Sequence, residues 1–296
     1  MPVKKIFKLL FIFGVILLIS AVLAPVLFKV LPFKFERIFN RLVMIQTILA
    51  ALLFVRVRKD ALSHYGLRWS PGELPLLGRG FAGGLVMMGV VAVFALKAGP
   101  ASFSMPGYTV PVWLSRLTKA LASGLVIGVI EEFFFRGFVF RSLQGRLRWP
   151  VWLAFIVTSV FYSLVHFLSD RAPFIGPNPT FRDGVKLALA PLGVVPAFPK
   201  IWEAALGLFI FGLILNDLSF RTKSLYPAIG LHAGCVFFIK MDGNFLDFPG
   251  GHDLILGSSL LYDGILGWCV LALFFGVFRF VIKGPQRNSI AAGVFR

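Results

Sequence analysis

The sequence predicts an all-α, polytopic membrane protein with about eight transmembrane helices. Hydrophobic residues make up 58% of the 296 residues and charged residues only 15%, whereas a soluble domain is usually about 45–50% apolar and about 25% charged. The mean hydropathy is +0.86. Several apolar runs exceed the 18 or so residues that cross a bilayer as a helix. Backbone in lipid must satisfy its own hydrogen bonds, which excludes open sheets.

The spanning segments follow from the apolar windows. Between the fifth and the sixth lies a proline-rich stretch, 169–200, whose apolar patch 187–199 carries three prolines. These prolines predict a re-entrant or surface element there rather than a ninth span. The first segment is long and lacks A-x-A spacing, which favours a spanning helix over a cleaved signal peptide. The predicted spans are residues 7–28, 40–56, 80–97, 114–140, 150–168, 202–217, 224–240 and 258–282.

The formal net charge of +17 comes from lysines and arginines at the ends of these apolar runs. The positive-inside rule accounts for this pattern, and because no nucleic-acid-binding motif occurs, we expect no nucleic-acid partner. Basic clusters precede the first span and follow the second, fourth, sixth and eighth. Both termini are therefore expected in the cytoplasm, with the bacterial plasma (inner) membrane as the expected location. The basic loop 29–41 departs from this pattern.

Two adjacent carboxylates lie in the middle of the fourth span, in the stretch EEFFFR at 131–136. Ionisable groups within a membrane are costly and mark functional sites by default. On a helix, Gly124, Gly128, Glu132 and Arg136 stack on one side, with Glu131 beside them. Glu132 and Arg136 form an i,i+4 pair, which leaves Glu131 without a counter-ion, as suits a general base. The glycines let another backbone approach the carboxylates closely.

Two histidines can reach the same depth in the membrane. Glu131 lies 17 residues before Arg148, and His166 lies 17 residues after Trp149. In an antiparallel helical hairpin the two side chains therefore reach the same height, roughly 25 Å from the turn. His232 lies within the seventh span. One glutamate and two histidines from three helices could activate a water and stabilise an oxyanion, or hold a divalent metal.

Structural interpretations of these residues were weighed against the functional one. A lone membrane histidine usually hydrogen-bonds between helices, and a Glu–Arg pair is often a staple, but a staple needs only one glutamate. Cys235 and Cys269 are interpreted as small buried hydrophobes, and Tyr262 and Trp268 as interface anchors or packing residues. The familiar zinc-protease and serine-hydrolase motifs do not occur. Together the residues favour function over structure.

At these residues the sequence resembles the CPBP (CAAX protease and bacteriocin-processing) family of intramembrane proteases, which is related to the type II CAAX prenyl endopeptidases. The resemblance covers about residues 114–240, and it implies that these form the central catalytic helix core. We expect a single transmembrane domain, 1–296, in which 1–113 and 241–296 flank that core. The matching motifs are Glu131-Glu132-x-x-x-Arg136-Gly137, Phe161-Tyr162-Ser-Leu-Val-His166 and Gly230-Leu231-His232-Ala233.

The resemblance implies an intramembrane endopeptidase of the glutamate type that hydrolyses a membrane-associated or lipid-modified protein. Glu131 and His166 would activate the attacking water, and His232 would help to stabilise the oxyanion. Glu132, Arg136 and Tyr162 would support the site. The resemblance implies no cofactor, and the alternative is a divalent metal such as zinc held by Glu131, His166 and His232.

The sequence departs from the family pattern at two positions. Tyr162 stands where phenylalanine is usual, which is a mild change. Val236 stands where the third motif usually places an asparagine four residues after its histidine, and a valine side chain donates no hydrogen bond to an oxyanion. The second departure keeps open a non-catalytic scaffold of the same fold. A proton- or metal-coupled transporter is a further alternative, although no inverted repeat or broken helix pair is detected.

Overall fold

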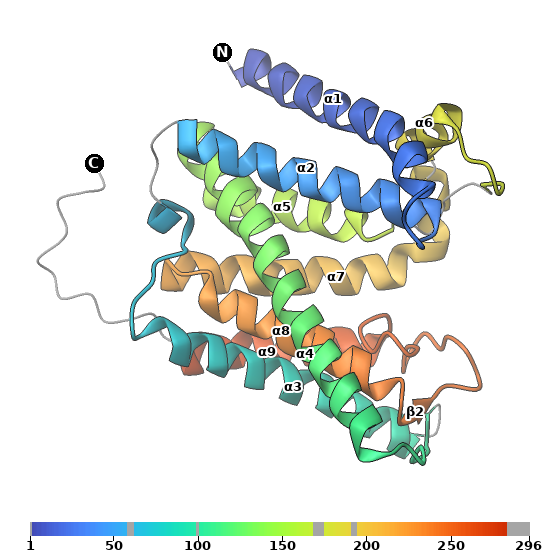
Figure 1. Ribbon diagram of the computed structural model, residues 1–296. Helices are drawn as coiled ribbons and strands as arrows, with labels where there is room; N and C mark the ends of the chain where they lie inside the picture. The colour runs from blue at the N-terminus through green and yellow to red at the C-terminus, as the bar shows by residue number, and fades with distance from the viewer. Residues whose placement is uncertain (1, 58–61, 99–100, 168–174, 191–193, 283–296) are drawn as a thin grey trace, which may run out of the picture.

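A computed structural model describes residues 2–57, 62–98, 101–167, 175–190 and 194–282. This part of the chain is almost wholly helical (Figure 1). Its strands, β1 (Ser102–Phe103) and β2 (Leu246–Asp247), form one short antiparallel pair. The α-helices are α1 (Pro2–Phe28), α2 (Phe35–Val57), α3 (Glu73–Ala98), α4 (Val110–Glu132), α5 (Val151–Val165), α6 (Phe181–Leu189), α7 (Val194–Thr222), α8 (Tyr226–Asp242) and α9 (Ile265–Val281). Shorter turns are the 3₁₀ helix η1 (Leu62–Tyr65) and the π-helices η2 (Phe133–Phe140) and η3 (Ser142–Arg146).

The all-α membrane fold is confirmed, and each predicted span overlaps one long helix. Among the described residues, 4 helices are long and apolar enough to cross a membrane by length and composition, namely α1, α2, α3 and α7. The helices α5 and α9 are apolar but shorter. The exact number of eight spans, the division into core and flanking helices, and the orientation in the membrane stay predictions.

The proline-rich stretch between the fifth and sixth spans is organised differently from the prediction. The helix α6 ends at Leu189, and α7 already begins at Val194, so the end of the apolar patch extends a spanning helix. Pro196 lies in the first turn of α7, where the missing N–H costs nothing. Pro191 lies outside the described residues.

A capping box begins the short helix α6. Thr180 and Asp183 form its reciprocal hydrogen bonds, which is the usual signature of a helix N-terminus. The Lys186 ammonium and Thr180 together lower the pKa of Asp183 to about 2. The cap therefore stays ionised at neutral pH and holds its bonds.

Polar contacts join the helix ends at one end of the bundle. Asp217 in α7 is buried and binds Arg221 at 2.7 Å and Arg279 of α9 at 3.0 Å. The Ser224 hydroxyl, just before α8, donates to Glu73 at the start of α3. These arginines belong to the basic clusters that the positive-inside rule groups on one side, so their gathering agrees with that prediction.

The helix α8 lies between α3 and α4 and contacts both of them (Figure 1). Glycines make this close approach possible. A Cβ atom added at Gly80 of α3 would lie 2.2 Å from the Pro227 carbonyl oxygen, and one at Gly124 of α4 would lie 2.6 Å from that of Ala233. Real Cβ atoms do not approach other atoms so closely, so only glycine fits. The expected use of the glycines, to admit a second backbone near the carboxylates, is confirmed.

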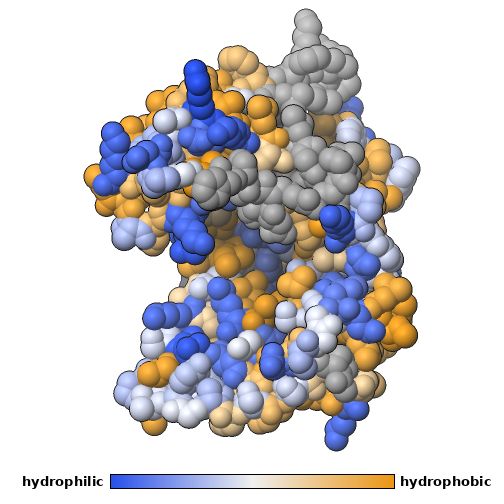
Figure 2. Space-filling model, turned by 90° about the vertical axis from the view of Figure 1, so that its right-hand side faces the viewer, coloured by the Kyte–Doolittle hydropathy of each residue, from blue (hydrophilic) through white to orange (hydrophobic). Residues whose placement is uncertain are grey.

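The helices α1, α2 and α6 pack on one another around their own apolar cluster, while the main cluster joins α3, α5, α7, α8 and α9. Figure 2 shows one end of the bundle, with the surface hollowed between an upper and a lower part. Both cysteines are free, and Cys235 is buried as expected. Cys269 is exposed, which corrects its interpretation as a buried hydrophobe: it lies on an outer face of α9. Such a face is compatible with lipid, so hydropathy does not distinguish it from the core.

Candidate active site

The three side chains that the sequence singled out meet in the middle of the bundle. Glu131 lies in the last turn of α4, His166 directly after α5, and His232 within α8. The Nε2 atoms of His166 and His232 lie 3.7 Å and 3.9 Å from Oε2 of Glu131. That oxygen is buried and has no hydrogen-bond partner among the described residues. The separations are too long for direct hydrogen bonds but suit a bridging water.

The two imidazoles are held by their other ring nitrogens. Nδ1 of His166 lies 2.7 Å from the carbonyl oxygen of Tyr162, one turn earlier in α5. Because a carbonyl only accepts, Nδ1 carries the proton and donates it. Nδ1 of His232 lies 2.8 Å from Oε1 of Glu132 and donates in the same way. In both histidines the Nε2 atom is therefore left to face Glu131.

Glu132 and Arg136 form the predicted i,i+4 pair, at 3.0 Å between Nη1 and Oε1, and both side chains are 0% exposed. The arginine also donates to the Gly212 carbonyl oxygen at 3.3 Å, and its guanidinium lies over the Tyr162 ring, 4.3 Å from the centroid. Arg136 thus joins α4 to α5 and α7. Glu132 differs from the prediction in one respect, because it binds His232 as well as the arginine.

The helix that carries these charges changes type within the predicted span 114–140. It is α-helical to Glu132 and continues as the π-helix η2 from Phe133 to Phe140. Single π-helical turns often occur at functional sites. Here the change lies directly after the two glutamates, and the buried face of η2 includes Arg136 and Gly137. Hydropathy patterns do not signal this change, since both helix types bury an apolar stripe.

A cavity of about 130 Å³ opens beside the two imidazoles. This volume would hold about four waters at roughly 30 Å³ each. Tyr162, His166, His232 and Tyr262 supply strong hydrogen-bonding groups on its wall, and the apolar lining includes Val236. The interpretation of Tyr262 as an anchor or packing residue therefore missed its place at the site. No local signal reveals this place, because Tyr262 reaches the cavity from a distant loop.

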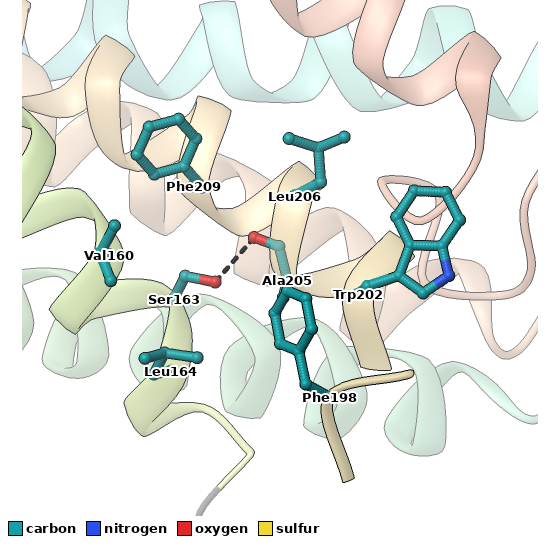
Figure 3. Close-up of a pocket in the computed structure, with 8 residues that line it drawn as sticks. All are labelled: Val160, Ser163, Leu164, Phe198, Trp202, Ala205, Leu206 and Phe209. Atoms are coloured by element: carbon teal, nitrogen blue, oxygen red, sulfur yellow. Dashed lines mark hydrogen bonds between the residues drawn. The ribbon is translucent and has the colours of Figure 1, made fainter. Parts of the chain in front are cut away.

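A second, larger pocket lies between α5 and α7 and has a volume of about 670 Å³. Figure 3 shows side chains from the two helices around it, with the Ser163 hydroxyl donating to the Ala205 carbonyl oxygen at 2.7 Å. Ser163 lies one helical turn before His166, so this apolar groove adjoins the site. Its lining includes Val160, Phe198 and Trp202.

The residues were tested as metal ligands. Among the described residues, no group of three or more His, Cys, Asp or Glu side chains is arranged to hold a metal ion. Glu131, His166 and His232 thus do not fit the zinc alternative as they are placed here. We derive no catalytic step through a metal.

Residues 112–238 match the family described as type II CAAX prenyl endopeptidase Rce1-like. The protein YyaK of Bacillus subtilis (strain 168), described as uncharacterized, is 23% identical over 207 residues. This similarity covers 67% of the present chain and 59% of that protein, so the chain spans less than two thirds of its relative's length. No solved structure gives a significant match. The expected resemblance to the CPBP family is confirmed over the matched residues.

Proposed function

Because residues 112–238 match the Rce1-like family, we propose that this integral membrane protein is an intramembrane endopeptidase. It hydrolyses a peptide bond in a membrane-associated or lipid-modified protein, with a water activated by Glu131 and His166. One observation supports this most. A buried carboxylate oxygen without a hydrogen-bond partner among the described residues faces two imidazole nitrogens at 3.7 and 3.9 Å, which is the spacing that a bound water fills.

In this mechanism the water lies between Glu131 and His166, and His166 holds it through Nε2. As the water oxygen attacks the scissile carbonyl carbon, Glu131 takes its proton as general base. The negative charge moves to the carbonyl oxygen, which needs a donor. His232 can donate from Nε2 only when both ring nitrogens carry protons, because Nδ1 already donates to Glu132. Glu131 then returns the proton to the leaving amine.

Cleavage can be tested directly on the purified full-length chain in proteoliposomes. The probes are two quenched fluorescent peptides of one sequence, one with a prenylated cysteine near its C-terminus and one unmodified. We expect cleavage of a peptide bond, located by mass spectrometry, and faster cleavage of the lipidated peptide. Proton or metal flux without cleavage would instead favour a transporter, and peptide binding without cleavage a scaffold.

The apolar groove between α5 and α7 is proposed to seat the lipid chain of the substrate. It adjoins His166 through Ser163 and offers almost only apolar side chains. Val160→Trp should fill part of the groove and raise KM for the lipidated peptide by about tenfold, which corresponds to 1.4 kcal/mol of lost binding. The unmodified peptide should be unaffected.

Val126→Trp provides the matched control for the groove. Val126 is 56% exposed on α4 and does not line the groove, so its replacement should change neither KM. If Val160→Trp slows both peptides equally, or neither, the groove does not seat the lipid.

Metal removal should leave the activity intact. Since the candidate ligands are not arranged to hold a metal, we expect thorough dialysis against a chelator to change kcat less than twofold. Metal analysis of the dialysed protein confirms that removal was complete. Loss of cleavage that zinc restores would show instead that Glu131, His166 and His232 act as ligands.

A further inference from the structure

We propose that Tyr262 is a further catalytic residue, whose hydroxyl donates a hydrogen bond to the oxyanion formed when the peptide carbonyl is attacked. This inference rests on the proposed function. The geometry points to Tyr262 through the cavity that it shares with His166 and His232, and through the backbone that places it there.

The cavity is small, at about 130 Å³. A carbonyl group that enters it therefore lies close to every wall. Both histidines already use Nδ1 elsewhere, and their Nε2 atoms face Glu131. Most of the remaining lining is apolar and offers no strong donor, Val236 included. The Tyr262 hydroxyl is a neutral donor that needs no prior protonation, unlike Nε2 of His232.

The backbone around Tyr262 is seated firmly between two helices. A Cβ atom at Gly207 of α7 would lie 1.9 Å from the Tyr262 carbonyl oxygen, and one at Gly267 of α9 would lie 3.0 Å from the Tyr262 Cα atom. Both contacts require glycine. The loop before α9 is thus inserted against α7 and α9, which fixes where the tyrosine ring begins.

The preceding residue supports the same conclusion. Leu261 is 1% exposed and has a φ of 63°, in the left-handed region that leucine rarely adopts. Such conformations cost of order 1–3 kcal/mol and persist where the surroundings enforce them, often at active sites. Asp263 helps to enforce this one, since its carboxylate accepts hydrogen bonds from the backbone N–H and the hydroxyl of Ser258. A donor held in place before the reaction is what oxyanion stabilisation requires.

The chemical step balances without a further reactant. The water oxygen bonds to the carbonyl carbon, the water proton passes to Glu131, and the carbonyl π electrons move to oxygen. Tyr262 hydrogen-bonds to that oxygen and keeps its own proton. When the carbonyl reforms, the C–N bond breaks and the amine takes the proton from Glu131.

Tyr262→Phe tests the inference, because it removes only the hydroxyl. With the lipidated reporter peptide we expect kcat to fall by about 10²–10³-fold, the usual loss of one oxyanion donor, while KM changes less than threefold. Tyr108→Phe is the matched control. Tyr108 is 36% exposed, packs on Arg116 and does not line the cavity, so its loss should change neither constant.

A binding measurement separates catalysis from structure. A phosphinate analogue of the reporter carries an oxygen in the place of the oxyanion, and Tyr262→Phe should weaken its binding by the same factor as kcat. Binding of an uncleavable amide-bond mimic should not change. A kcat within threefold of the wild type, or equal weakening of both ligands, would overturn the role of Tyr262.

The outcomes also separate this inference from the function on which it rests. If Glu131→Gln is inactive while Tyr262→Phe keeps its kcat, only the role of Tyr262 is wrong. If Glu131→Gln cleaves as fast as the wild type, the proposed function fails and this inference fails with it.

Discussion

Glu131→Gln is expected to lower kcat for the reporter peptide by at least about 10³-fold, within the range that general-base catalysis contributes. Glutamine has the same shape as glutamate but cannot take a proton from water. The fold should survive, because Oε2 of Glu131 has no hydrogen-bond partner among the described residues and the side chain is 28% exposed. Steady-state kinetics in proteoliposomes, with thermal unfolding of the same preparation, measures both effects.

Glu36→Gln is the matched control for this variant. Glu36 lies in the first turn of α2, a helix that packs with α1 and α6 rather than around the site. The control should cleave at the wild-type rate. If Glu131→Gln retains more than a tenth of the wild-type kcat, the carboxylate is not the base, and the water must be activated by another group.

Much of the fold follows from the sequence because lipid imposes a simple constraint. A chain that crosses the bilayer must form apolar helices, so hydropathy locates most of the long helices to within a few residues. The meeting of Glu131 and His166 follows equally well, since equal distances from one turn bring two side chains to one height. This hairpin argument needs no knowledge of the other helices.

The parts that the sequence did not reveal depend on protein packed against protein. The predicted span 258–282 begins too early, because α9 starts at Ile265 and the residues before it form a loop. That loop is apolar since it is inserted between helices, and hydropathy cannot distinguish burial in protein from burial in lipid. For the same reason Tyr262 escaped notice.

The bond from His232 to Glu132 was also not foreseen. It depends on how α8 is placed along α4, which is set by the approach of the two backbones at Gly124 and Gly128. The sequence indicates that a close approach is possible there, but it does not specify the partner or its register. Glu132 was consequently paired with Arg136 alone.

Arg136→Met is expected to cause the largest loss of stability, about 3–5 kcal/mol, which is typical when one partner of a buried ion pair is removed. Both Glu132 and Arg136 are 0% exposed. The variant leaves the carboxylate in a site without water and with His232 as its remaining partner. It also removes the bond to Gly212 and the contact with the Tyr162 ring. Denaturant titration in detergent measures the change in the free energy of unfolding.

Arg79→Met is the control for that titration. Arg79 is exposed on α3, so its loss should stay within about 0.5 kcal/mol, as is usual for surface substitutions. If Arg136→Met costs less than 1 kcal/mol, the pair contributes little and the arginine has another role.

The double variant Glu132→Gln/Arg136→Met distinguishes stability from catalysis. It removes both charges, so no buried charge is left unpaired, and most of the lost stability should return. Cleavage should not return with it. Glu132 accepts the proton on Nδ1 of His232, and an amide in its place can present either an oxygen or an N–H to the imidazole. The histidine then loses the one arrangement that directs Nε2 at Glu131, even though the helix around it is intact. A double variant that is both stable and fully active would show that the buried pair serves the fold alone.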